Sequence, residues 1–322
     1  CALPIFMDRP DFTLNATFNI GRNKNKIDKL ASGEKEMVLS SGWAGSQLLN
    51  SDDYRAYVGG TTGLIYGFVN DGFYTVDDFK PFDSKSRTWT LKDGVVNSSP
   101  LSGDPRPGNA KFKKLTPVDE NSANPYTLTD DDRTVIGNTT PKFSGGFGLN
   151  ATFKGFDVSA FFNFMYDFDV FNANKVMMTT WASNNYNNFS MDISAAKRWR
   201  NFDDMGNEIR YSPEILAEFN KNATMWNPTS IGRPIAMSYA VEDGSFLRLN
   251  TATIGYTLPR AWTNKVGLSR VRFYASGYNL FTITGYSGYD PEVDIATGLT
   301  PNIDNNRYPR SRTYTFGVQL TF

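Results

Sequence analysis

The sequence contains no histidine and a single cysteine, and these two shortages exclude several kinds of protein. Without histidine, the chain lacks the commonest general base, the Ser/His and Cys/His nucleophile pairs and the ligands of most zinc sites. Because Cys1 is the only cysteine, no disulfide can form within the chain. These shortages remove the residues of many nucleophilic enzymes and of most zinc sites. Our prediction is a protein that is not an enzyme and holds no resident metal or cofactor.

A charge imbalance and a long apolar run are also missing. Lys and Arg together number 33, as do Asp and Glu, so nothing indicates a nucleic-acid partner. The mean hydropathy is -0.42, and no apolar run approaches the ~20 residues that a membrane helix needs. This argues against helical spans but not against a membrane barrel, whose strands are only half apolar. Aromatic residues make up 15% of the chain, which suits both the aromatic girdles of a barrel and sugar-stacking surfaces.

Strict alternation of apolar and polar residues is the clearest pattern that is present. From Tyr314 to Phe322 the apolar residues fall on one face of a strand and the uncharged polar ones on the other. The same pattern recurs along the chain, and Lys154-Gly155 forms a tight turn between two such segments. We predict six strands, near residues 11–20, 143–153, 156–166, 245–258, 270–282 and 312–322.

Long and short connections alternate between these strands. Residues 21–142, 167–243 and 283–311 form three long loops, whereas residues 154–155 and 259–269 are short links. Neighbouring antiparallel strands then place every long loop at one end, as in outer-membrane barrels. A soluble β-sandwich has no reason to sort its loops by length. The second loop is expected to hold helices near 192–201 and 214–220, and residues 260–265 a helical turn that Gly267 ends.

The predicted fold is therefore all-β: a segment of an antiparallel transmembrane β-barrel with long extracellular loops and short periplasmic turns. Eight strands are the practical minimum for a bacterial barrel. We therefore expect the chain to be a fragment, with Cys1 an arbitrary edge and further strands upstream. The alternative, that Cys1 is the lipid-bearing residue of a lipoprotein, would leave no tether before the first strand.

Several segments resemble the carboxyl-terminal part of SusC/RagA-type TonB-dependent outer-membrane transporters of Bacteroidota. They include Val241-Glu-Asp-Gly-Ser-Phe-Leu-Arg-Leu-Asn250, Gly255-Tyr-Thr-Leu-Pro259, Tyr278-Asn-Leu-Phe-Thr282, Tyr286-Ser-Gly-Tyr-Asp-Pro-Glu-Val293 and Arg312-Thr-Tyr-Thr-Phe-Gly-Val318. The resemblance implies a 22-stranded barrel, of which these six would be strands 17 to 22, with a plug domain that this chain lacks. It further implies a SusD-type lipoprotein as lid, energy from TonB–ExbB–ExbD, and import of oligosaccharides or peptides. An acidic calcium-loop-like run of the family is degenerate here at residues 119–124, so we predict no calcium site.

The candidate functional residues follow from this interpretation. For solute binding they are the loop aromatics Trp181, Tyr186, Trp199 and Trp226 and the lumen-facing Arg248 and Arg272. Loop packing for the aromatics, and structural ion pairs for the arginines, are the alternatives. For lid docking or loop shaping they are Tyr286, Tyr289, Asp290 and Glu292, and for the membrane girdle Phe153, Phe156, Tyr256, Trp262 and Phe322.

Two other functions stay open at this point. A soluble β-rich carbohydrate-binding or adhesion module would also use aromatics, but it would bury the apolar face of its terminal strand. A glycan-cleaving enzyme needs two positioned carboxylates. The acidic pair Asp203-Asp204 exists, yet nothing in the sequence positions it opposite a glycosidic bond.

Overall fold

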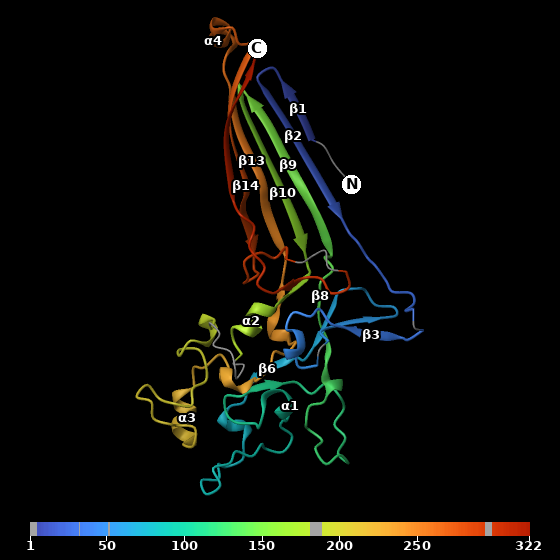
Figure 1. Ribbon diagram of the computed structural model, residues 1–322, viewed down its shortest axis with the longest axis vertical. Helices are drawn as coiled ribbons and strands as arrows, with labels where there is room; N and C mark the ends of the chain where they lie inside the picture. Colours follow the sequence, from blue (N-terminus) through green and yellow to red (C-terminus); the bar gives the residue numbers. More distant parts are fainter. Residues whose placement is uncertain (1–4, 32, 51, 181–188, 294–297) are drawn as a thin grey trace.

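The main element of the protein is a seven-stranded antiparallel sheet. The computed structural model describes residues 5–31, 33–50, 52–180, 189–293 and 298–322. Its strands pair in the order β1-β2-β9-β10-β13-β14-β16, so β1 and β16 form the two edges (Figure 1). These strands are β1 (Ile5–Arg9), β2 (Phe12–Gly21), β9 (Phe143–Phe153), β10 (Phe156–Tyr166), β13 (Phe246–Thr257), β14 (Arg270–Thr284) and β16 (Thr313–Thr321).

Each of the six ranges predicted from alternation holds one of these strands, whereas β1 was not predicted. Phe6 and Met7 are adjacent apolar residues, so the short β1 has no clean period of two. It forms because β2 offers a free edge, and Met7 pairs with Leu14 across a two-residue turn.

The two faces of the sheet differ sharply in polarity. Directly paired residues point to the same face, so the register defines rows that cross the strands. One such row contains Leu14, Ala151, Val158, Ile254, Ala275 and Phe316. The next row, on the opposite face, contains Asn15, Asn150, Ser159, Thr253, Ser276 and Thr315. The apolar row is not packed in a core: Ile254 is 53% and Phe316 81% exposed.

Short connections cluster at one end of the sheet, as predicted. Lys154 and Gly155 both adopt positive φ (48° and 89°), the geometry of a tight two-residue hairpin turn. The link between β13 and β14 forms α4 (Arg260–Thr263) and the 3-10 turn η7 (Asn264–Val266). Gly267 ends this helical segment with φ 73°, which an L-residue rarely adopts. Figure 1 shows α4 beyond the end of the sheet, far from the long loops.

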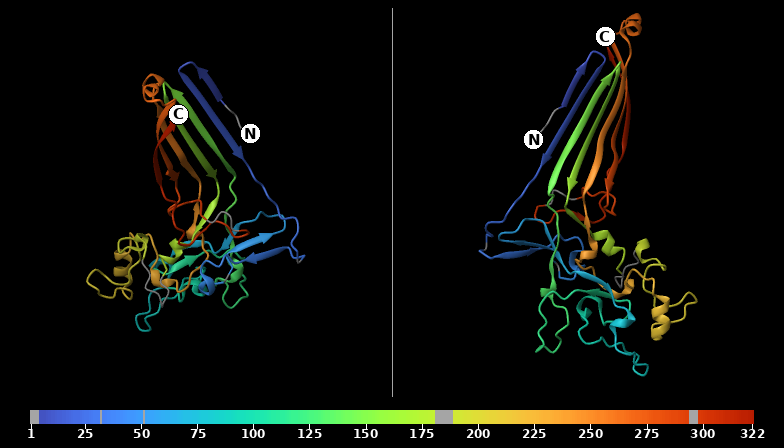
Figure 2. Two further views of the ribbon diagram at one scale, coloured as in Figure 1. Left: turned by 45° about the horizontal axis from the view of Figure 1, so that its top comes forward. Right: turned by 180° about the vertical axis from the view of Figure 1, so that it is seen from behind.

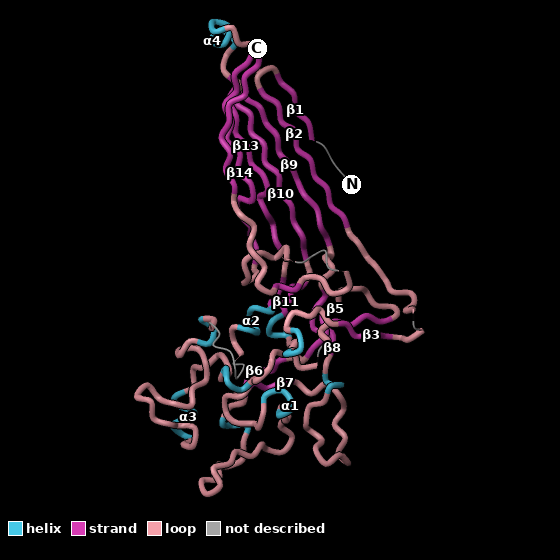
Figure 3. The backbone as a smooth tube through the Cα atoms, viewed as in Figure 1, coloured by secondary structure: helices cyan, strands magenta, loops and turns pink. Residues whose placement is uncertain are grey.

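The three long loops fold together into one body at the other end (Figures 1 and 2). Figure 3 shows that its strands are short and separated by extended loop segments. One sheet of the body contains β3 (Glu36–Leu39), β4 (Tyr54–Tyr57), β5 (Leu64–Gly67) and β8 (Thr134–Asn138). A second sheet consists of β6 (Asn70–Phe73) and β7 (Ala110–Phe112). A third sheet consists of β11 (Asp169–Asn172), β12 (Val241–Asp243) and β15 (Ile303–Asp304). The helices are α1 (Ser99–Ser102), α2 (Ala173–Met177) and α3 (Pro213–Phe219), with 3-10 turns η1 (Gly45–Gln47), η2 (Val76–Asp78), η3 (Asp130–Asp132), η4 (Met191–Ile193), η5 (Pro228–Ser230) and η6 (Ser238–Ala240).

A shared core connects the three loops. Trp43 of the first loop, Phe171 of the second and Ile303 of the third belong to one cluster of buried residues. The Trp43 and Phe171 rings lie 5.5 Å apart, and β11 pairs with β15 in parallel. The loops are thus one packed unit, hereafter the loop body, and fix one another's positions.

The helix expected over residues 192–201 is mostly absent, whereas α3 confirms the helix expected near 214–220. Only η4 forms in the former range. Trp199 belongs to a buried cluster with Ile209 and Leu216, and its backbone N–H donates to the Met225 carbonyl at 2.8 Å. This pairing holds the chain in an extended form, so tertiary contacts override the local helical composition.

Within the described ranges, no helix has the length and apolar character required to cross a membrane.

Candidate functional site

The candidate site is the polar face of the sheet and the point where the loop body joins it. On this face Arg272 of β14 and Asp157 of β10 form a bidentate ion pair, with Nε–Oδ1 and Nη2–Oδ2 distances of 2.8 and 2.5 Å. The pair crosses β13 at Gly255, where a Cβ atom would lie 2.5 Å from Arg272 Nη2. These contacts explain why glycine is followed by tyrosine at positions 255 and 256. Gly255 leaves room for the ion pair on the polar face, and Tyr256 points to the apolar face.

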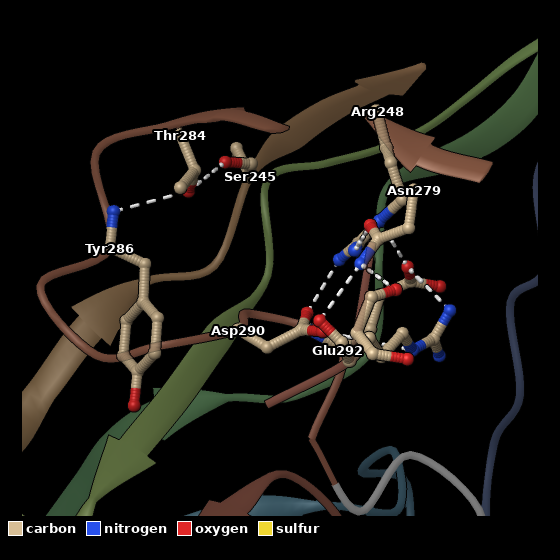
Figure 4. Close-up of polar contacts among 9 residues, drawn as sticks. Ser245, Arg248, Asn279, Thr284, Tyr286, Asp290 and Glu292 are labelled. Carbon is tan, nitrogen blue, oxygen red and sulfur yellow. Dashed lines mark hydrogen bonds and ion pairs between the residues drawn. The ribbon is translucent and has the colours of Figure 1, made fainter. Parts of the chain in front are cut away.

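A second, more deeply buried ion network lies at the junction with the third loop (Figure 4). Arg248 is only 2% exposed and its Nη2 lies 2.5 Å from Asp290 Oδ1. Its Nε lies 2.9 Å from Glu292 Oε2, and its Nη1 donates to Asn279 Oδ1 at 2.6 Å. Arg310 approaches the same Glu292 oxygen at 3.3 Å from the outer side. Two guanidinium groups and two carboxylates therefore bind the third loop to strands β13 and β14.

Tyr286 and Tyr289 occupy contrasting positions in that loop. Tyr286 is buried, and its hydroxyl donates to Asp304 Oδ2 at 2.7 Å. Burial raises the pKa of Tyr286, and its hydrogen bond to the Asp304 carboxylate raises it further, so the phenol stays neutral. Its backbone N–H donates to Thr284 Oγ1, as Figure 4 shows. Tyr289 is instead 83% exposed. Tyr286 thus helps to shape the loop, and Tyr289 is free to contact another molecule.

Glu242 connects the second and third loops. It accepts hydrogen bonds from Ser287 N and Oγ at 2.9 and 2.8 Å, and Lys175 Nζ lies 3.3 Å away. Burial by itself would raise the pKa of Glu242, but the Ser287 hydrogen bonds and the Lys175 charge outweigh it and lower the pKa. Glu242 therefore stays ionised at neutral pH and keeps the two loops together. Within the described ranges, no group of three or more Asp, Glu or Cys side chains is arranged to hold a metal ion.

Two of the loop tryptophans proposed for solute binding are buried. Trp199 is 3% and Trp226 2% exposed, and Trp226 packs edge-on against Tyr239 with the two ring centroids 4.8 Å apart. Neither ring presents a face to a solute in this structure, so the packing alternative describes both. Trp181 and Tyr186 lie outside the described residues. Arg248 and Arg272 are on the polar face of the sheet, and both are engaged in the ion pairs described above.

The residues proposed for the membrane girdle are on the surface. Phe153, Phe156 and Tyr256 are aligned with further aromatics in one row of the apolar face, which runs Phe12, Phe153, Phe156, Tyr256 and Phe273. Trp262 on α4 is 61% exposed and the terminal Phe322 90% exposed. All lie near the end with the short connections, and the register shows that five strands contribute one aromatic each to the row.

Sequence reasoning missed a cleft at the far end of the loop body. It is a cavity of about 730 Å³ between the segments around residues 87–89, 102–109 and 201–232. Trp89, Tyr211, Arg87, Arg106 and Arg210 contribute to its wall. Arg87 lies 5.2 Å from the Tyr211 ring centroid. Only the tertiary fold brings these residues together, because more than a hundred positions separate Arg87 from Tyr211 in the chain.

Comparison with known proteins places these features in a family context. No family model matches the chain. TonB-dependent receptor P3 of Formosa agariphila is 30% identical over 318 residues, which are 97% of this chain and 27% of that protein. TonB-dependent receptor SusC of Bacteroides thetaiotaomicron is 32% identical over 164 residues, or 47% of this chain and 15% of SusC. This chain thus spans only about a quarter of the first of these relatives.

Solved structures show the same fold. A structure of the RagAB peptide transporter superposes with a TM-score of 0.63 and 21% identity, covering 100% of this chain and 28% of that one. The RagAB peptide importer in its open-open state gives the same TM-score of 0.63. At this identity the likeness concerns the fold alone, and this chain corresponds to only part of a much longer one.

Proposed function

Since this chain is part of a SusC/RagA-type TonB-dependent receptor of the bacterial outer membrane, we propose that it forms a section of the barrel wall and outer loops of an active importer. The main observation behind this proposal is a sheet with one apolar and one polar face, whose long loops all lie at one end. The exposed apolar row suits hydrocarbon, and the row of Asn, Ser and Thr suits a wet lumen. A soluble carbohydrate-binding module would bury the apolar row instead.

The height of the apolar face supports a membrane position. Ten residue steps separate Phe12 in the aromatic row from Arg22, just beyond the end of β2. They correspond to about 33 Å along a strand, and at the tilt of about 40° that is typical of barrels this matches an apolar band about 25 Å tall. In this proposal Phe153, Phe156, Tyr256, Trp262 and Phe322 form the periplasmic-side girdle of a 22-stranded barrel.

The transported solute is proposed to be an oligosaccharide, with a peptide as the second candidate. The cleft in the loop body offers aromatic rings beside guanidinium and amide groups, a lining that suits sugars with polar or acidic substituents. The structural relatives named as peptide transporters keep the second candidate open. Arg248 and Arg272 act by holding the lumen wall and the third loop in shape, and transport requires no covalent catalysis by this chain.

The partners are proposed from the same relationship. A SusD-type lipoprotein would cover the loop body, and Tyr289 is our candidate for the contact because it is exposed on a loop that Arg248 holds in place. Energy would come from TonB–ExbB–ExbD through parts of the receptor outside this chain. Tyr289→Ala should reduce co-purification of the lipoprotein with the full-length receptor, whereas Tyr308→Ala, at an equally exposed tyrosine, should not.

The proposal is tested in the bacterium that carries the receptor. A strain lacking the receptor gene should fail to grow on one class of oligosaccharide or peptide as carbon source, and the intact gene should restore growth. Uptake of that solute should stop when a protonophore collapses the inner-membrane potential. Normal growth of the deletion strain on every glycan and peptide of the panel, or uptake insensitive to the protonophore, would contradict active import.

A further inference from the structure

A basic cavity lies where β2 leaves the sheet. Beyond Gly21 the chain diverges from β9 and runs toward the loop body (Figure 1). Asn25 fixes its far end, since Asn25 Oδ1 accepts the Thr62 N–H at 3.1 Å and Asn25 Nδ2 donates to Thr62 Oγ1 at 3.2 Å. The space enclosed between this segment, residues 138–142 and residues 167–169 is about 600 Å³.

The charges that line this cavity do not balance. Its cations are Arg22, Lys24, Lys26 and Lys142, and its carboxylates are Asp167 and Asp169. Lys142 Nζ lies 3.2 Å from Asp167 Oδ2, and Asp169 Oδ2 accepts the Asn138 N–H at 2.7 Å. In the described part of the chain, the other three cations form no ion pair.

The position of the cavity indicates what it meets. The Arg22 guanidinium lies 6.0 Å from the centroid of Phe143, which is paired with Tyr166 at the loop-body end of the apolar face. The Arg22 guanidinium therefore lies beside an aromatic ring at this end of the apolar face, which is the outer boundary of the apolar band in the proposed membrane position. At this level a bilayer presents its headgroups rather than its acyl chains.

We propose that this cavity binds the phosphorylated headgroup of a glycolipid of the outer leaflet. Arg22, Lys24 and Lys26 would contact phosphate oxygens, because arginine and lysine form charge-assisted hydrogen bonds with phosphate. Asn23, Thr61 and Thr140 line the same space and offer amide and hydroxyl groups to sugar hydroxyls. The inference depends on the membrane position of the chain and not on which solute is imported.

Purified full-length receptor in detergent tests the proposal by native mass spectrometry with three probes: phosphorylated lipid A, phosphate-free lipid A and inorganic phosphate. The test variant is Arg22→Gln/Lys24→Gln/Lys26→Gln. The matched control, Lys154→Gln/Arg260→Gln/Lys265→Gln, removes the same charge at the opposite end of the sheet. Phosphorylated lipid A should bind saturably and lose at least about tenfold in affinity in the test variant, since a hydrogen bond to a charged group stabilises by more than a factor of ten. It should bind the control as it binds the wild type.

Four results would overturn the proposal. Affinity within about twofold of wild type in the test variant would exclude these cations. An equal loss in the control would show a general effect of net charge. Competition by inorganic phosphate as strong as by the lipid, or equal binding of phosphate-free lipid A, would exclude recognition of a phosphorylated lipid. If the triple variant does not fold, the exposed Lys24→Gln alone should still weaken binding, and unchanged binding would count against the site.

Discussion

Arg272 on β14 and Asp157 on β10 form an ion pair that passes over Gly255 of the strand between them. The pair ties three neighbouring strands together on the polar face, and it does so only because the middle strand has no side chain at that point. A bidentate Arg–carboxylate pair has a fixed geometry, so it also fixes the register of the strands that carry it.

Gly255→Ala should therefore destabilise the barrel wall. The new Cβ would lie 2.5 Å from Arg272 Nη2 and 2.6 Å from Asp157 Oδ1, so the ion pair must move. We expect the free energy of unfolding to fall by about 1–3 kcal/mol, as for other overpacked sites. The measurement is the temperature at which the full-length receptor changes from folded to unfolded mobility on a gel, which should be lower in the variant. Gly285→Ala is the control, because no atom lies within 4 Å of a Cβ placed there. Equal melting of the two variants would disprove the steric argument.

Arg248→Met should release the third loop. Asp290 and Glu292 would keep buried carboxylates facing only the more distant Arg310, and breaking a buried pair costs about 3–5 kcal/mol. Cleavage by trypsin within residues 285–312, followed by mass spectrometry, should become at least about tenfold faster, because local opening is governed by the same free energy. Tyr289→Ala, which removes an exposed ring, should leave the cleavage rate unchanged. Wild-type protection in Arg248→Met would show that other contacts hold the loop.

Trp226→Ala should destabilise the loop body without revealing a solute contact. The ring is fully buried beside Tyr239, and truncation of such a residue costs about 3–5 kcal/mol. Trp226→Phe retains most of the packing. A receptor with this substitution should therefore import solute with the half-saturation concentration of the wild type in an uptake assay. A folded Trp226→Phe receptor with a strongly raised half-saturation concentration would instead return this residue to the solute site.

Asp132 should make the loop body sensitive to acid. Burial alone would raise the pKa of Asp132, but hydrogen bonds from Thr116, Thr129 and Leu115 outweigh it and lower the pKa to about 2. Because the folded pKa lies below the unfolded value, the stabilisation is fully present above about pH 4 and is lost as pH falls toward 2; it amounts to about 2 kcal/mol. Thermal unfolding of wild type and Asp132→Asn should differ most at pH 6, by about half as much at pH 3, and converge as pH falls toward 2. A constant difference would refute the assignment.

Trp262 should lie in the lipid interface. It is exposed on α4 at the end with the short connections, whereas every other tryptophan of the chain is in the first or second long loop. In proteoliposomes, brominated lipids should quench the emission of Trp262, measured as the difference between wild type and Trp262→Phe, more strongly than aqueous iodide does. The reverse order would place α4 in water, away from the bilayer.

The sequence by itself determined the strands of the sheet and the ends at which their connections lie. Alternation with a period of two is a local property, so it identified β2, β9, β10, β13, β14 and β16 and both faces of each. Lys154 and Gly155 set a tight turn through their own backbone preferences. β1 was not predicted, because a short strand with adjacent apolar residues is defined by its pairing partner rather than by its own pattern.

Only the tertiary structure decided what the loops do. Trp199 and Trp226 are buried because segments distant in the chain close over them, and no local pattern distinguishes a packed tryptophan from one that stacks on a sugar. The same holds for the choice of partners: Arg248 meets Asp290, and Arg272 meets Asp157, 115 positions away. Such contacts depend on strand order and loop closure, which involve the whole chain, whereas the period of a strand is set by neighbouring residues alone.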